Sequence, residues 1–233
     1  MRPRRNCAPG RSRRCGREPL RTRSTRSASA QGALSAHVRP WQERLETGHR
    51  AVQEDWNSLV LNSRTLRAWE PHIIPGLFQT ADYARSVFEG LAELMGTTRD
   101  TDDAVRARMK RQEWLRLPGR ELQQLVWEGA LCLRLGSREV MVAQLEQLLA
   151  VLELDTVRLG VVPFDSVLPL VIGNGFTMVD ERLVVTEDWH TEHWLDAPDA
   201  IALHRRVWET HAASAVYGAD ARSLIVKAVD ALR

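Results

Sequence analysis

Hydrophobic residues recur at helical spacing in six segments of the chain, each with charged or polar residues on its other side. The segments are residues 40–66, with a helix of roughly twenty residues, and residues 80–95, 104–117, 137–152, 198–216 and 220–232. Thr80 and Ser137 stand where an N-cap residue accepts a hydrogen bond from the first turn. The pattern therefore predicts amphipathic helices that pack one face against a core.

Four shorter segments are rich in β-branched and aromatic residues. They are residues 123–127, 156–162, 175–179 and 183–187. Only residues 180–182 separate the last two segments, which predicts a hairpin with a tight turn. Short connections favour antiparallel pairing. We therefore expect an α+β fold, with helices packed on a small antiparallel or mixed sheet of at least four strands.

Two prolines, Pro71 and Pro75, hold the backbone extended ahead of the helix that begins at Thr80. Ile73 and Ile74 lie between them and require burial. Pro75 and the glycine after it form a turn signal. We expect an extended apolar arm that enters the helix through a fixed corner.

Charge divides the chain into two regions. Residues 1–39 hold eleven arginines and one acidic residue, Glu18, so this segment carries +10 and residues 40–233 carry −8 of the net +2. The segment has little to bury, which predicts a disordered Arg/Ser-rich tail before a single domain at 40–233. Three interpretations of the tail stay open: a nucleic-acid-binding arm, a targeting peptide, or, as we favour, a segment with no evolved function.

Composition excludes several classes of protein. No run of about 18 apolar residues is present, so no membrane span is expected. The N-terminus lacks the apolar region of a secretory signal peptide. Cys7, Cys15 and Cys132 are too few and too scattered for a disulfide framework or a zinc site. We expect a cytoplasmic protein without a cofactor.

The segment at 70–85 resembles a family pattern that reads Glu-x-x-x-Ile/Val-Pro-Gly-Leu-Leu-Gln-Thr-x-x-Tyr-Ala-Arg. The matching residues are Glu70, Pro75, Gly76, Leu77, Gln79, Thr80, Tyr83, Ala84 and Arg85, while Phe78 replaces a leucine. Further blocks match in order at Met141, Gln144, Leu145 and Leu148, and at Ser223, Leu224 and Ile225. The chain from about residue 50 onwards is similar to the C-terminal domain of unknown function that follows an Xre-type helix-turn-helix in actinobacterial (Streptomyces-like), antitoxin-like transcriptional regulators.

This resemblance implies helices packed on a sheet and a module for sensing or interaction. It implies as partner a small protein encoded nearby or a small-molecule effector, with a homodimer as a further option. It carries no catalytic residues over to this chain. No helix-turn-helix is present in this sequence, so we expect DNA binding only if that module is supplied upstream.

Six residues are candidates for contact with a ligand or partner. Arg108, Arg111 and Gln112 match the Arg and Arg-Gln positions of the family in a helix crowded with basic residues. A solvated basic face is the plainer interpretation of that helix, and an inward-facing anion site is the alternative. The others are Glu128 after a strand, and Trp189 and Trp194 in a partly exposed aromatic patch.

One segment collects metal-ligating side chains: Glu187, Asp188, His190, Glu192 and His193. Two histidines three positions apart do not converge as they would on a helix, since the chain here leaves a strand. No catalytic motif such as Gly-x-Ser-x-Gly, a phosphate loop or His-Glu-x-x-His appears in the sequence.

We therefore expect a non-enzymatic effector-sensing or protein-interaction domain of a transcriptional regulator. A metal-dependent enzyme that uses His190, His193 and Glu187 is one alternative. Nucleic-acid binding through the basic N-terminal arm is the other.

Overall fold

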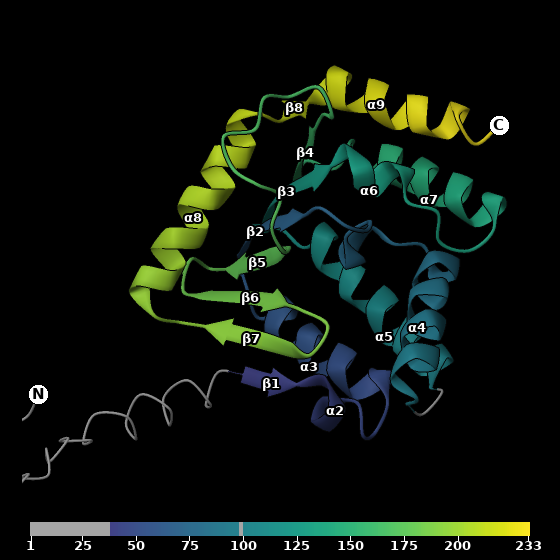
Figure 1. Cartoon of the computed structure of the whole chain (residues 1–233), viewed down its shortest axis with the longest axis vertical. Helices are drawn as coiled ribbons and strands as arrows, with labels where there is room; N and C mark the ends of the chain where they lie inside the picture. The colour runs from purple at the N-terminus through teal and green to yellow at the C-terminus, as the bar shows by residue number, and fades with distance from the viewer. Residues whose placement is uncertain (1–37, 98–99) are drawn as a thin grey trace, which may run out of the picture.

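The computed structural model describes residues 38–97 and 100–233, and their strands form one mixed sheet in the order β1-β7-β6-β5-β2-β3-β4-β8 (Figure 1). The strands are β1 (Val38–Pro40), β2 (Thr65–Glu70), β3 (Glu121–Trp127), β4 (Val157–Val162), β5 (Phe176–Val179), β6 (Leu183–Glu187), β7 (Thr191–Leu195) and β8 (Val216–Tyr217). Strands β2, β3 and β4 are parallel to one another, and the remaining pairs are antiparallel. The predicted α+β fold with a mixed sheet is confirmed.

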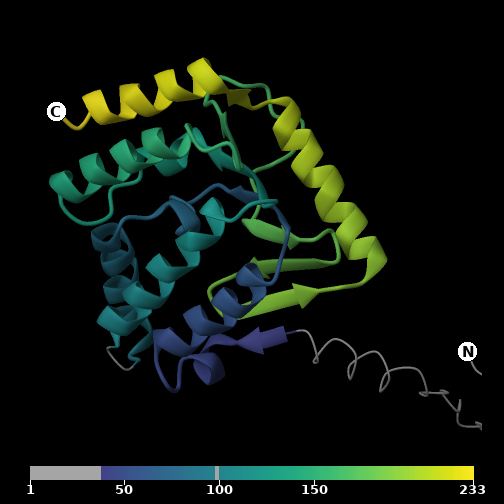
Figure 2. The ribbon, with the colours of Figure 1, turned by 180° about the vertical axis from the view of Figure 1, so that it is seen from behind.

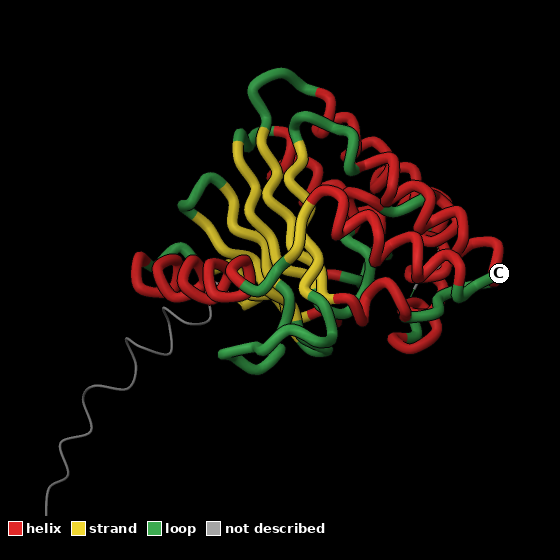
Figure 3. The backbone as a smooth tube through the Cα atoms, turned by 90° about the horizontal axis from the view of Figure 1, so that it is seen from above, coloured by secondary structure: helices red, strands yellow, loops and turns green. Residues whose placement is uncertain are grey.

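Helices cover both faces of the sheet unequally. They are α2 (Trp41–Arg44), α3 (His49–Leu61), α4 (Ala81–Met95), α5 (Thr101–Arg111), α6 (Glu128–Cys132), α7 (Arg138–Val151), α8 (Pro198–Ala213) and α9 (Gly218–Asp230), with 3₁₀ turns η1 (Gly76–Phe78) and η2 (Gln112–Arg116). Seen from above, one long helix lies on one side of the strand layer and most helices lie on the other (Figure 3). Parallel strands that connect through helices need this cover because both of their faces are apolar.

The two faces have separate cores. On the α8 side, Ile201 and Trp208 pack with Trp69 and Leu125 of the central strands. On the other side, a larger core joins side chains of α3, α4, α7 and α9 to the same sheet. The view from behind shows these helices arranged around the sheet, with α9 beside α7 (Figure 2).

Local signals in the sequence fix several of these elements. The Thr80 hydroxyl accepts a hydrogen bond from the Tyr83 amide and caps α4, and Ser137 caps α7 in the same way. The β5–β6 hairpin turns at Asp180 and Glu181, which both have positive φ, as a tight turn between twisted strands requires. The predicted caps and the predicted hairpin are confirmed.

The predicted helix of roughly twenty residues within 40–66 is wrong, because the chain there forms α2, a break, α3 and then the start of β2. Gly48 makes the break with φ of +95°, a conformation that favours glycine. The carboxylate of Asp100 then accepts hydrogen bonds from the amides of His49 (2.9 Å) and Arg50 (2.8 Å) and caps α3 from another element.

Strands β1, β2, β7 and β8 were not predicted from the sequence. Strand β2, which ends at Glu70 just before the expected extended arm, is a central strand paired with β3 and β5. Val38 and Arg39, which the sequence places in the basic tail, belong to β1 and pair with β7. The rest of the tail, with its predicted disorder, lies outside the described residues. In the part of the chain that the structure describes, no helix is long and apolar enough to cross a bilayer.

Candidate functional site

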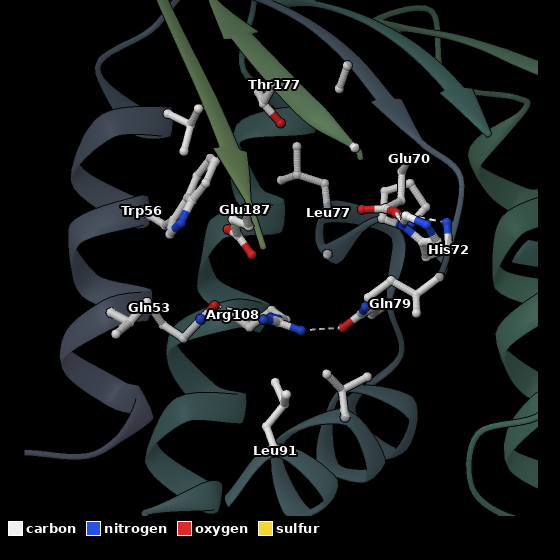
Figure 4. A pocket seen from close by; sticks show the side chains of 18 of the residues that line it. Gln53, Trp56, Glu70, His72, Leu77, Gln79, Leu91, Arg108, Thr177 and Glu187 are labelled. Carbon is white, nitrogen blue, oxygen red and sulfur yellow. Dashed lines mark hydrogen bonds and ion pairs between the residues drawn. The ribbon is translucent and has the colours of Figure 1, made fainter. Parts of the chain in front are cut away.

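A cavity of about 740 Å³ lies between α3, α4 and α5 on one side and β2, β5 and β6 on the other (Figure 4). Most of its wall is apolar, with side chains that include Val52, Trp56, Leu77, Phe88, Leu91 and Met95. Polar side chains form the smaller part of the wall, and the arginines of α5 are the most basic of them. An apolar cavity with a small number of placed polar groups is the usual form of a small-molecule site.

Arg108 and Arg111 stand three positions apart on α5, which puts them on one face of the helix and turns both toward the cavity. The side-chain oxygen of Gln53, on α3, accepts hydrogen bonds from Arg108 Nε (3.1 Å) and Arg111 Nη2 (2.7 Å). Gln79 Oε1 accepts from Arg108 Nη1 at 2.6 Å. Neutral amide oxygens therefore fix the geometry of both guanidinium groups without cancelling their charge.

In the described chain, neither guanidinium forms an ion pair with a carboxylate. Burial lowers the pKa of Arg108 to about 10 and that of Arg111 to about 9. Both side chains still carry a positive charge at neutral pH. No hydrogen bond to another described residue uses Arg108 Nη2 or Arg111 Nη1. The site thus holds two fixed positive charges with donors to spare, which is what an anion requires.

The two interpretations of the basic helix divide along its faces. Arg106 is exposed and pairs with Asp103, and Lys110 is also exposed. These side chains form the solvated face. Arg108 and Arg111 lie on the opposite, inward face. The basic residues of this helix therefore include both solvent-exposed side chains and side chains that line the cavity.

Two glutamates enter the same cavity from the sheet. Glu187 is the last residue of β6, and Figure 4 shows its carboxyl on the same side of the cavity as Arg108. Glu187 is exposed to the space of the cavity, and partial desolvation by the surrounding protein, together with Glu192 and Glu70 nearby, raises its pKa to about 7. Glu70 ends β2, and burial also raises its pKa, although its carboxyl accepts a hydrogen bond from the His72 amide at 3.0 Å.

The wall beside these groups is held by a buried ion pair. Glu192 of β7 is fully buried and pairs with Arg44 of α2 and with Arg39 of β1. It also accepts a hydrogen bond from the Trp56 indole at 3.0 Å. The ring of Trp56 lies 5.8 Å from the Arg111 guanidinium. Trp56 thereby connects the ion pair to the arginine floor of the cavity.

The structure brings together three of the six candidate residues. Arg108, Arg111 and Trp189 line the cavity, with Trp189 three-quarters exposed. Gln112 supports the site from behind, since its side chain donates to the Gln79 carbonyl at 2.6 Å.

Glu128 and Trp194 are not among the residues that line the cavity. Glu128 is buried and accepts a hydrogen bond from the Phe164 amide at 2.7 Å. Trp194 packs under the Arg39 guanidinium, 4.8 Å from its ring centre. The contacts of both side chains in the structure are therefore with neighbouring parts of the fold.

The segment with metal-ligating side chains forms a turn and strand β7. Glu187 enters the cavity and Glu192 pairs with arginines, while Asp188 accepts from the amides of His190 and Thr191. His193 hydrogen-bonds to Thr191. Within residues 38–97 and 100–233, no group of three or more His, Cys, Asp or Glu side chains is placed to hold a metal ion.

Sequence reasoning missed Gln53 and Trp56 as site residues. Both lie on α3 and reach residues of α5 and β7 far along the chain. Gln79 stood in the family pattern, which was a signal that it matters, but the pattern did not indicate that its side chain binds Arg108. Glu70 also belongs to the family pattern, and the pattern did not indicate that this residue lines the cavity.

Residues 55–227 match the family model described as "Domain of unknown function (DUF5753)". Because the match spans most of the chain, the protein belongs to this family. No curated protein matches the chain.

The solved structures that resemble this chain share little sequence identity with it and have low TM-scores. They include Nuc from Salmonella typhimurium, a phospholipase D family member (13% identity, TM-score 0.40, 78% of this chain and 95% of that one), and NucT from Helicobacter pylori (8%, 0.41, 78% and 97%). The archaeal chromatin protein TrmBL2 is a third (12%, 0.34, 73% and 51%).

Proposed function

We propose that this domain senses a small anionic effector that binds in the cavity against Arg108 and Arg111, and that it does so for a transcriptional regulator without catalysing a reaction. The observation that carries the proposal is the pair of arginines, Arg111 buried and Arg108 partly buried, without a carboxylate partner. A buried charge is costly unless a counter-charge accompanies it. An anionic ligand would supply that counter-charge.

The shape of the site supports binding of an anion with an apolar body. The arginines occupy one part of the cavity, and leucine, valine and aromatic side chains make up most of the remaining wall, which the two glutamates also enter. The volume of about 740 Å³ is within the range of sites for drug-sized ligands. The glutamines that hold the arginines also fix them before a ligand arrives, which reduces the entropy lost on binding.

Two fluorescent probes with related ring systems test the proposal. 8-Anilinonaphthalene-1-sulfonate (ANS) carries a permanent anionic group, and N-phenyl-1-naphthylamine (NPN) lacks it. We expect the protein to bind ANS more tightly than NPN. R108Q and R111Q should each weaken ANS binding by about tenfold or more, because a hydrogen bond to a charged group contributes about 1.5–3 kcal/mol. Their NPN affinity should stay within about twofold.

Arg106 provides the matched control, since it lies on the same helix but on the exposed face. R106Q should bind both probes like the unmodified protein. Cooperative thermal unfolding of every variant establishes that the fold is intact. Equal affinity for ANS and NPN, or equal loss of ANS binding in R106Q and R108Q, would contradict the proposal.

Protein interaction is the second candidate function. The loop after β4 exposes apolar side chains, with Val167 and Val171 about nine-tenths exposed. Contiguous exposed apolar side chains are typical of interaction sites. If the domain binds a small protein encoded nearby, V167D together with V171D should abolish its co-purification and leave ANS binding unchanged. Co-purification that survives both substitutions would rule out this loop.

A further inference from the structure

Glu187 is the acidic group in the arginine cavity that has no fixed partner. Only its backbone oxygen takes part in a hydrogen bond to a side chain, from Asn174 Nδ2 at 3.1 Å. Its carboxyl forms no hydrogen bond or ion pair with another described residue. Arg108 and Arg111 are near enough to stabilise its charge, yet neither forms an ion pair with it. The carboxyl and the guanidinium groups thus share one cavity while staying apart.

Charged groups near Glu187 come from three elements, β7, β2 and α5, whereas β5, which pairs directly with β6, has no charged side chain. Glu192 of β7 is its register partner, and Glu70 approaches from β2. Arg108 and Arg111 approach from α5. The two glutamates and burial favour the protonated form of Glu187, and the two arginines offset this only in part, so the pKa stands at about 7.

An anion bound to the arginines adds a further negative charge close to Glu187. Ionised Glu187 would repel it across the same cavity. Protonated Glu187 would not repel it, and its O–H becomes a hydrogen-bond donor to the anion. The anion therefore binds best when Glu187 carries a proton.

We propose that the effector is an amphipathic organic acid and that it binds together with one proton, which resides on Glu187. The acid group lies against Arg108 and Arg111, and the apolar body lies against the side chains of α3 and α4, such as Val52 and Leu91. This inference rests on the proposed function, and it adds the chemical class of the ligand and its coupling to pH.

The pH dependence of ANS affinity tests the coupling, because the sulfonate stays ionised throughout and any change belongs to the protein. If binding requires the protonated carboxyl, affinity should be nearly constant below pH 6 and fall about tenfold between pH 6 and pH 8. In E187Q the affinity should vary by less than about twofold over that range. Calorimetry at pH 7 in phosphate and in Tris should show uptake of about half a proton by the unmodified protein and none by E187Q.

Two further variants isolate the effect. E209Q removes an exposed carboxylate on α8, on the opposite face of the sheet, and should keep the full pH dependence. E70Q removes one of the charges that face Glu187, so the fall in affinity should begin at a lower pH. Thermal unfolding checks that each variant is folded.

The outcomes separate the two proposals. ANS affinity that depends on Arg108 but not on pH, or a pH dependence that persists in E187Q, overturns the proton coupling and leaves the anion site standing. A lack of preference for ANS over NPN overturns both.

Discussion

At the scale of single residues, the site depends on Gln53, whose one oxygen accepts from both arginines. An amide supports the two guanidinium groups without neutralising them. A carboxylate of the same shape would neutralise them from inside the protein. The choice of Gln over Glu at this position therefore keeps the cavity open to an external anion.

The substitution Q53E tests this point. We expect ANS affinity to fall about tenfold, since the new carboxylate pairs with the two arginines that the sulfonate would otherwise bind. NPN affinity should stay unchanged. The melting temperature should rise, because two hydrogen bonds from charged arginines to a neutral oxygen become ion pairs with a carboxylate. Fluorescence titration and thermal unfolding measure the two effects. Q147E, on α7 and outside the cavity wall, is the control. Unchanged ANS binding in Q53E would contradict this account.

Part of the site could be predicted from the sequence. Arg108 and Arg111 followed from their place in the family pattern, but the pattern did not separate them from Arg106 and Lys110 on the same helix. Their partners could not be predicted, because Gln53 lies 55 positions from Arg108 and the contact exists only after α3 and α5 pack together. Glu187 was placed in a metal-ligand group because its neighbours in sequence are acidic or histidine. In the structure its surroundings come from other elements.

At the scale of elements, the packing of α3 against α5 begins at Asp100. Its carboxylate caps α3 across a gap of 50 positions, and a Cβ on Gly48 would lie only 2.5 Å from that carboxylate. The Asp100 cap and Gly48 together therefore determine the residue at which α3 starts. The start of α3 in turn determines where along α5 Gln53 contacts Arg108 and Arg111.

We expect D100A to lower the free energy of unfolding by about 1–2 kcal/mol, the usual cost of losing a helix N-cap. D100N should lose less, since its side-chain oxygen can still accept one of the two bonds. Urea denaturation followed by tryptophan fluorescence measures both. D103A removes an exposed carboxylate of α5 and should change stability by no more than about 0.5 kcal/mol. A D100A protein as stable as the unmodified one would show that the cap is unimportant.

Prediction of helices succeeded where hydrophobic residues recur at a regular helical spacing and a clear N-cap residue precedes them, as in α4 and α7. It failed at β2, where Ala68 and Trp69 are both buried and alternation is lost. It failed at β7 because Glu192 is a charged residue in a fully buried position. That charge is tolerated only because Arg44 of α2 and Arg39 of β1 reach it, which no local pattern records.

At the scale of the whole molecule, β1 and α2 supply the counter-charges for Glu192. A chain that begins at residue 38 keeps them, and a chain that begins at residue 48 loses both arginines. We expect the first to unfold at the same denaturant concentration as the full chain. The second should be less stable by about 3–5 kcal/mol, the cost of leaving a buried charge unpaired.

The substitution E192Q distinguishes loss of charge pairing from loss of packing. In the full chain it should destabilise the fold, because it breaks the pair with Arg44. In the chain that begins at residue 48 it should raise stability, because it removes the unpaired charge. If E192Q destabilises both chains equally, the ion pair is not what the first elements contribute. Urea denaturation of the four proteins decides this.

The pairing of β1 with β7 also has a consequence for how the protein is made. Arg44 and Glu192 are 148 positions apart, so β1 and α2 cannot pair with β7 until most of the chain has left the ribosome. Contacts between such distant positions form late, since a long loop must close first. During synthesis, the wall of the cavity that contains Trp41 and Leu45 is therefore open until β7 has emerged. A newly made chain gains a complete cavity only when synthesis is almost finished.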